Sequence, residues 1–170
     1  MIPTIEDVKA AAKRIEGIAV KTPLIRNDVL DEITGAKVWV KAENLQRGGA
    51  FKMRGATNAI AALAPEVRAK GVIAFSSGNH AIAVATASKI FGIKATIVMP
   101  ADAPRIKLDT TRSLGATVVT YDRVSESREE IGDRLAAEGG LSLIKPFDDP
   151  FVLAGQGTAG LEIADLISPD

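Results

Sequence analysis

The pattern of apolar and polar positions predicts strands that alternate with helices from residue 71 onward. Short apolar runs of β type occupy residues 72–75, 95–100, 117–122 and 141–144. The stretches between them, at residues 81–92, 105–114 and 127–138, have the length of helices, and Gly92 and Gly115 mark two helix ends. This alternation is typical of an α/β fold with an open, parallel, twisted sheet and helices on both of its faces.

The segment before residue 71 predicts a helix, a strand and a second helix. Residues 5–15 carry apolar positions at spacings of three and four, with Thr4 as the N-cap. Apolar and polar residues alternate at residues 37–41, and this predicted strand leads into a polar, glycine-containing segment at residues 43–49. Lys52 is therefore expected shortly after a strand end, before a helix at residues 56–63. At the other end of the chain, residues 153–167 predict a glycine-rich turn followed by an apolar helix.

Composition narrows the classes of partner. The 170 residues include 21 Lys plus Arg and 21 Asp plus Glu, so the formal net charge is zero and no nucleic-acid or anionic-membrane surface is expected. The absence of cysteine excludes disulfides, thiol nucleophiles and cysteine-ligated metals. The N-terminal residues lack the pattern of a signal peptide, and no apolar run reaches the roughly 18–20 residues that a membrane helix needs. We expect a cytoplasmic protein with a small, neutral or zwitterionic ligand and no metal.

A polar turn follows the apolar run at residues 72–75 and opens the next helix. It presents hydroxyl groups, a glycine and an amide where the N–H groups and the positive dipole end of a helix would attract a carboxylate or phosphate. An alternative is that Ser77 or Asn79 merely caps the helix. The turn consists of Ser76, Ser77, Gly78, Asn79 and His80. His80 is the only histidine of the chain, and such a residue is either a hydrogen-bonded structural histidine or a general base.

Two further motifs invite a chemical interpretation. Residues 155–160 match G-x-G-x-x-G, but they do not directly follow a strand, so the context argues against a dinucleotide site. Lys52 has Gly48 and Gly49 before it and Phe51 beside it. A tight backbone and an aromatic neighbour suit a partly desolvated lysine, whose neutral amine can form an imine. Taken alone, the same surroundings also suit a surface lysine beside a turn.

Several segments in order resemble the fold-type II pyridoxal-phosphate enzymes, especially threonine/serine dehydratases and serine racemase. The resemblance covers nearly the whole chain. It rests on KTPL at 21–24, KAENLQ at 41–46, AFKMRGA at 50–56, SSGNHA at 76–81, SLGATVV at 113–119 and PFDDPFVLAGQGTAGLEI at 146–163. It implies an architecture like that of the tryptophan synthase β subunit. Residues 1–52 would belong to the large cofactor domain, residues 53–150 to a small α/β domain, and residues 151–170 to a return segment.

The resemblance implies pyridoxal 5'-phosphate as cofactor and a role for each matching residue. Lys52 would carry the cofactor as a Schiff base and remove the α-proton, Phe51 would pack near the ring, and Asn79 would bond the phenolic oxygen. Ser77 would be the acid/base on the opposite face, as in racemases. The substrate carboxylate would be held by Ser76, Ser77, Gly78, Asn79 and His80.

The implied reaction is that of an ammonia-lyase (dehydratase), which converts a β-hydroxy amino acid such as threonine or serine into a 2-oxo acid and ammonia. Ala50 and Ile82 stand where the family commonly has serine and glutamine. These changes are compatible with a bulkier or less usual β-hydroxy amino acid, for instance a hydroxyaspartate, a phenylserine or a hydroxyectoine-derived compound, and the sequence selects none of them. Two alternatives remain: a serine or aspartate racemase, and a non-catalytic binding or assembly module. Because family members are longer, the resemblance implies a truncated chain without the remainder of the large domain, and a homodimer for the full-length protein.

Overall fold

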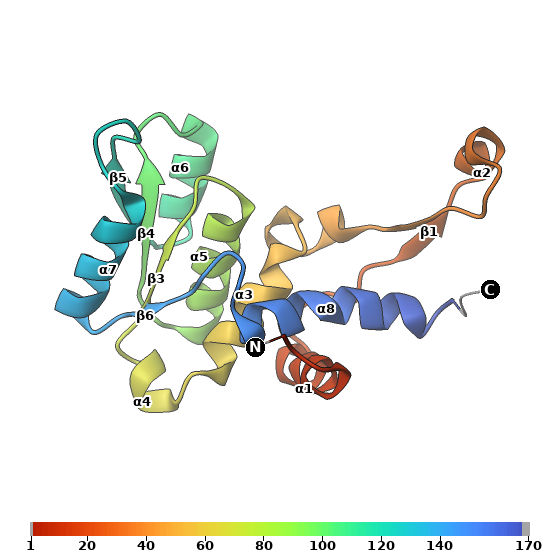
Figure 1. Ribbon diagram of the computed structural model, residues 1–170, viewed down its shortest axis with the longest axis horizontal. Coiled ribbons are helices and arrows are strands. Elements are labelled where there is room, and N and C mark those ends of the chain that lie inside the picture. The colour runs from red at the N-terminus through yellow and green to blue at the C-terminus, as the bar shows by residue number, and fades with distance from the viewer. Residues whose placement is uncertain (1, 168–170) are drawn as a thin grey trace.

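A computed structural model describes residues 2–167 and contains a four-stranded parallel sheet. The strands are β3 (Val72–Phe75), β4 (Ala95–Pro100), β5 (Thr117–Tyr121) and β6 (Ser142–Leu143), in the order β5-β4-β3-β6 (Figure 1). All three neighbouring pairs are parallel. The predicted open parallel sheet is confirmed, with each strand within a residue or two of its predicted bounds.

Helices cover both faces of this sheet, as predicted. On one face lie α5 (Asn79–Phe91) and α6 (Arg105–Ser113), and on the other lies α7 (Arg128–Gly139) (Figure 1). Because side chains alternate along a strand, Ile97 and Met99 of β4 join the core beneath α5 and α6, whereas Val98 joins a second core beneath α7. We call residues 72–143, which contain the sheet and these three helices, the sheet lobe.

Three further helices pack together beside the sheet lobe. They are α1 (Ile5–Ile15), α3 (Lys52–Ala62) and α8 (Pro150–Ala164), with a short α4 (Pro65–Arg68) leading into the sheet. Thr4 caps α1 as predicted, in a reciprocal capping box with Asp7. Glycines allow α3 and α8 to touch: a Cβ atom added to Gly155 would lie 2.6 Å from the Arg54 carbonyl oxygen and 2.8 Å from Gly55 Cα. No larger residue fits this contact.

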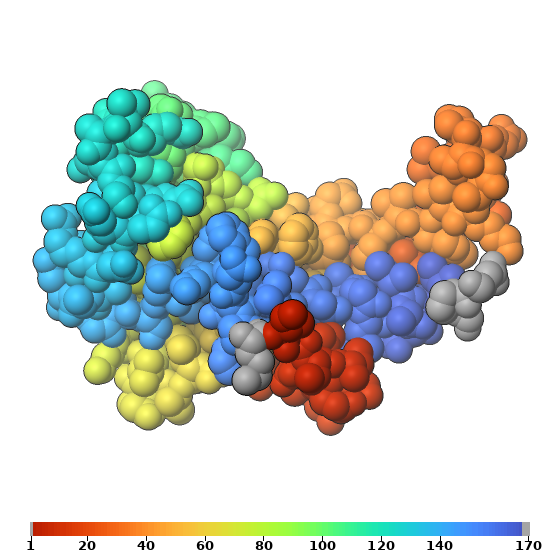
Figure 2. All heavy atoms as spheres, in the orientation of Figure 1, coloured from red at the N-terminus to blue at the C-terminus, as the bar shows by residue number. Residues whose placement is uncertain are grey.

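Residues 24–41 form an arm that extends away from the helices. It consists of β1 (Leu24–Arg26), α2 (Asp28–Thr34) and β2 (Trp39–Lys41), and β1 pairs with β2 in antiparallel fashion. Figures 1 and 2 show the arm projecting on the side opposite the sheet lobe, with a wide hollow between the two. Of these elements, only the strand at residues 37–41 was predicted, and it is observed as β2. The three-residue β1 and the seven-residue α2 were missed, because such short elements leave little pattern in the sequence.

Two local predictions were wrong. Helix α3 begins at Lys52 itself rather than at residue 56, and two 3-10 turns, η1 (Glu43–Leu45) and η2 (Arg47–Gly49), separate it from β2. The predicted glycine-rich turn is helical, because Asp149 caps α8, Pro150 begins it, and its glycines are used for packing. Residues 168–170 of the predicted return segment lie outside the described residues. Within residues 2–167, no helix combines the length and the apolar character needed to span a membrane.

Candidate active site

The carboxyl edge of the sheet brings Lys52 and the polar turn together. The turn at residues 76–78 follows β3, and residues 144–146 follow β6, which is the parallel neighbour of β3. Lys52 Nζ donates a hydrogen bond to the Pro146 carbonyl oxygen at 2.7 Å, and His80 Nε2 bonds the Ile144 carbonyl oxygen at 2.9 Å. The segment after β6 therefore holds both residues, at the edge where ligands of open α/β sheets gather.

Lys52 is the first residue of α3 and is half-buried. Burial lowers the pKa of its ammonium group from the ordinary value for lysine. Its Nζ lies 5.3 Å from the centre of the Phe51 ring. In the part of the chain that the structure describes, no carboxylate lies within ion-pair distance of this amine, which a backbone carbonyl holds instead. These properties fit a lysine that binds a carbonyl compound covalently.

No side chain caps the start of α5. Gly78 is the N-cap and provides no capping group, and the Gly78 N–H donates to Ser76 Oγ at 3.2 Å. Since neither the Ser77 nor the Asn79 side chain accepts a hydrogen bond from the helix start, the alternative that one of them merely caps the helix is wrong. Both side chains are exposed. The start of this 13-residue helix therefore has backbone N–H groups that could donate hydrogen bonds to an anion.

His80 contributes to the turn with its backbone only, because its ring packs inward. The side chain is 3% exposed, and burial lowers its pKa to about 4. The hydrogen bond to the Ile144 carbonyl opposes this lowering of the pKa, and the charge of Lys52 adds to it. The ring is therefore neutral at pH 7. Since a carbonyl only accepts, Nε2 carries the proton, and the buried Nδ1 has no partner in the described residues. This geometry favours the structural interpretation of His80 over that of a general base.

Lys107 was not singled out from the sequence, yet it reaches the same turn. It lies in the first turn of α6, which follows β4, the other neighbour of β3. Its Nζ donates to Asn79 Oδ1 at 3.3 Å. Segments that follow the three adjacent strands β6, β3 and β4 therefore meet around the turn. The placement of Lys107 just beyond a parallel strand was the signal that could have revealed it.

A buried ionic cluster fixes the first turn of α3. The Arg54 guanidinium is completely buried and bonds both oxygens of Glu43, at 2.9 and 2.7 Å, and both oxygens of Glu162, at 2.6 and 3.0 Å. Thr158 and the Val20 carbonyl accept further bonds, and Lys41 pairs with Glu162 at 2.5 Å. Although burial opposes the charge, the hydrogen bonds of the two carboxylates raise the pKa of Arg54. The sequence carried no sign of this cluster, because its members come from separate elements.

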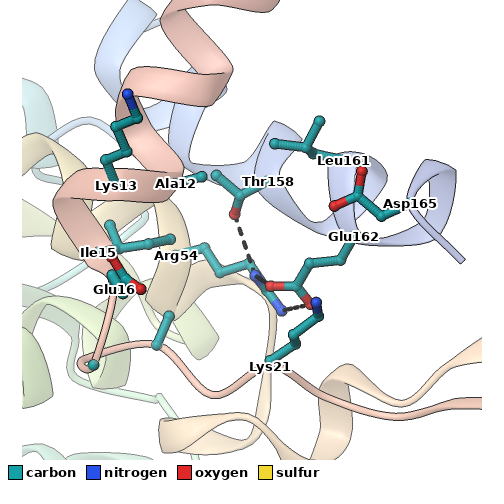
Figure 3. Close-up of a pocket in the computed structure, with 12 residues that line it drawn as sticks. Ala12, Lys13, Ile15, Glu16, Lys21, Arg54, Thr158, Leu161, Glu162 and Asp165 are labelled. Atoms are coloured by element: carbon teal, nitrogen blue, oxygen red, sulfur yellow. Dashed lines mark hydrogen bonds and ion pairs between the residues drawn. The ribbon is translucent and has the colours of Figure 1, made fainter.

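Figure 3 shows Arg54, Glu162 and Thr158 at one wall of a cavity of about 420 Å³. The cavity lies between α1, the segment that follows it and α8, and both acidic and basic side chains line it. It is separate from the edge of the sheet that carries Lys52 and the turn. The G-x-G-x-x-G pattern lies inside α8, where Gly155 is buried against α3, so it forms no dinucleotide-binding turn.

Comparisons with known proteins identify the family of this chain. Residues 15–170 match a family model described as "Pyridoxal-phosphate dependent enzyme". The chain is 50% identical over 165 residues to an L-threo-3-hydroxyaspartate ammonia-lyase of Saccharomyces cerevisiae. This alignment covers 97% of this chain and 51% of the yeast protein. It is 47% identical over 162 residues to the L-threonine ammonia-lyase of Thermotoga maritima, which covers 95% of this chain and 40% of the relative.

The structure is also similar to a solved structure of maize serine racemase, with a TM-score of 0.95 and 39% identity. The superposition covers 98% of this chain and 51% of the maize chain. The chain thus spans about half the length of the relatives that it matches.

Proposed function

The chain belongs to the family of pyridoxal-phosphate dependent enzymes. We propose that it is part of an ammonia-lyase, which converts β-hydroxy amino acids to 2-oxo acids and ammonia. Threonine, serine and 3-hydroxyaspartate are the substrates to test first, since relatives at 47–50% identity are named for reactions on two of them. The observation that carries the proposal is that a half-buried lysine amine, without a carboxylate partner among the described residues, lies at the same edge of the sheet as an uncapped helix start.

The residues present fit the cofactor that the family uses. Lys52 would hold the pyridoxal group through its amine, Phe51 would pack near the ring, and Asn79 would donate to the phenolic oxygen. When bound, the cofactor supplies an electron sink for negative charge at the substrate α-carbon. The lowered pKa of Lys52 increases the fraction of neutral amine, which is the form that both bonds a carbonyl and accepts a proton.

The substrate carboxylate would bind at the turn formed by Ser76, Ser77, Gly78, Asn79 and His80. Backbone N–H groups at the start of α5 and the positive end of the helix would hold it. Once the amino group of the substrate has displaced the Lys52 amine from the cofactor, the free amine could accept the α-proton at Nζ. The β-hydroxyl group would then leave as water, and hydrolysis of the released enamine would give the 2-oxo acid and ammonia. The division into residues 1–52, 53–150 and 151–170, the cytoplasmic location and the homodimer stay predictions from the sequence.

One observation favours a second activity of the same family. Ser77 is exposed on the turn, where a hydroxyl group could return a proton to the α-carbon from the side opposite Lys52. The maize relative is a serine racemase. Racemisation and dehydration of serine are separated by their products, since only dehydration releases a 2-oxo acid.

Covalent labelling tests the proposal directly. The chain is mixed with pyridoxal phosphate at pH 7.5 and reduced with borohydride, and the modified lysine is mapped by mass spectrometry. We expect the label on Lys52, with little on Lys94, which is exposed and lies at the opposite edge of the sheet. Label spread evenly over exposed lysines would refute a cofactor site in this chain. The remaining hypothesis would then be a non-catalytic binding or assembly module.

Product analysis then distinguishes the two activities. L-Serine, L-threonine and L-threo-3-hydroxyaspartate are incubated with the cofactor-loaded chain and with the Lys52→Ala variant. We expect 2-oxo acid from the parent chain and none from the variant. Formation of the opposite serine enantiomer without any 2-oxo acid would refute the dehydratase activity and support a racemase activity instead.

A further inference from the structure

The contact between Lys107 and Asn79 fixes which end of the Asn79 amide faces outward. A lysine ammonium only donates, so the Asn79 atom at 3.3 Å from Lys107 Nζ must be the acceptor Oδ1. The Nδ2 hydrogens are then directed away from Lys107 and are left to donate elsewhere. Without Lys107, the exposed Asn79 side chain could present either its oxygen or its nitrogen, because the two ends of an amide have nearly the same shape.

The surroundings of Lys107 leave it available for this contact. The nearby acidic residues are engaged by arginines: Asp102 pairs with Arg123 at 2.7 Å, and Asp109 lies 3.6 Å from Arg105 and 3.5 Å from Arg112. Within residues 2–167, Lys107 forms no ion pair with a carboxylate. Its side chain is half-buried, which restricts where Nζ can reach.

The position of Lys107 is electrostatically unfavourable for the free protein. The first turn of α6 contains no acidic residue, although the positive end of a helix favours acids and disfavours cations. The Lys107 ammonium also approaches the first residue of α5, which is the positive end of a second helix. A side chain placed against these local preferences is expected at a functional site, where a bound anion compensates for the cost.

We propose that Lys107 is a positioning residue for the cofactor, holding the Asn79 amide with its Nδ2 donor directed at the phenolic oxygen. The inference rests on the proposed function, in which Asn79 provides that donor. An Asn79 amide turned the other way would place Oδ1 against the phenolic oxygen, so two acceptors would face each other.

The first test uses the cofactor-free chain labelled with ¹⁵N. The side-chain amide signals of Asn79 are identified by their loss in Asn79→Asp and are compared in Lys107→Met, Lys107→Arg and Lys94→Met. Lys94 precedes β4 whereas Lys107 follows it, so Lys94→Met removes the same charge at the opposite edge of the sheet. We expect Lys107→Met to shift or broaden the Asn79 signals, and Lys107→Arg and Lys94→Met to preserve them. Unchanged Asn79 signals in Lys107→Met overturn the inference.

The second test measures the affinity for pyridoxal phosphate and the pH dependence of the visible absorbance of the bound cofactor. Loss of one oriented hydrogen bond should weaken binding roughly fivefold in Lys107→Met and move the pH midpoint of the absorbance, with recovery in Lys107→Arg. Equal weakening in Lys94→Met would mean that general charge is responsible and would overturn the inference. If borohydride labels no specific lysine, the proposed function fails, and the cofactor-free spectra still decide whether Lys107 orients Asn79.

Discussion

Replacing Arg54 by methionine would test whether the buried ionic cluster holds α3 in place. The substitution keeps an apolar chain of similar length and leaves Glu43 and Glu162 buried without their main partner; their side chains are only 14% and 18% exposed. Removing one partner of a buried ion pair costs about 3–5 kcal/mol. Since domains of this kind are stable by about 5–15 kcal/mol, the variant should lose a large part of its stability.

Urea denaturation followed by circular dichroism measures this loss. With a typical slope of 1–3 kcal/mol per molar urea, the midpoint should fall by roughly 2 M. The control is Arg123→Met, which breaks the Arg123–Asp102 pair of 2.7 Å between side chains that are 53% and 65% exposed. An exposed pair contributes about 0–1 kcal/mol, so the midpoint of this control should move by less than about 0.5 M. Equal shifts in the two variants would refute the reasoning.

A double variant separates lost charge balance from lost packing. In Arg54→Met/Glu162→Gln, the remaining charges of the cluster, Lys41 and Glu43, balance again. The double variant should therefore be more stable than the sum of the two single losses predicts, by about 0.5–3 kcal/mol. Strict additivity would show that the cluster acts through packing alone.

Two further predictions concern stability. The pKa of His80 is about 4 in the folded chain and 6.5 in the unfolded one, so the unfolded state binds more protons between these values; the free energy of unfolding should fall by about 3 kcal/mol from pH 6.5 to pH 4. In His80→Gln, the urea midpoint should therefore depend less on pH between 4 and 6.5 than it does in the parent chain. An equal pH dependence of the two midpoints would contradict this prediction. Gly155→Ala should cost about 1–3 kcal/mol, because its Cβ would overlap the Arg54 carbonyl. Gly160→Ala, in the same helix but in open space, should instead gain up to about 1 kcal/mol, and equal melting temperatures for the two variants would refute the argument.

Features encoded in consecutive residues could be predicted from the sequence. Strands β3 and β4 are fully or almost fully buried, so their runs of apolar residues stand out from the polar turns that follow. The turn before α5 was identified for the same reason, since it directly follows such a run. The identity of the cofactor came from the family resemblance, because no local pattern around Lys52 could specify it.

Features that depend on distant residues were missed. Arg54 lies before the helix predicted at residues 56–63, and nothing near it in the chain indicates that Glu43 and Glu162 will surround its guanidinium. The glycines of residues 155–160 looked like a turn because glycine disfavours helices in isolation, whereas close packing against α3 outweighs that preference. Lys107 was overlooked because its partner Asn79 lies 28 residues away.

The contact between α3 and α8 has a consequence for the order of folding. Its hydrogen bonds join residues far apart in the chain: Arg54 and Thr158 are separated by 104 residues, and Asn58 and Phe151 by 93. Closing so long a loop is entropically costly, whereas the sheet lobe between the two helices forms through shorter-range contacts. We therefore expect the lobe to form first and to bring α3 and α8 together, so that the Lys52 amine reaches its place only in the last stage of folding.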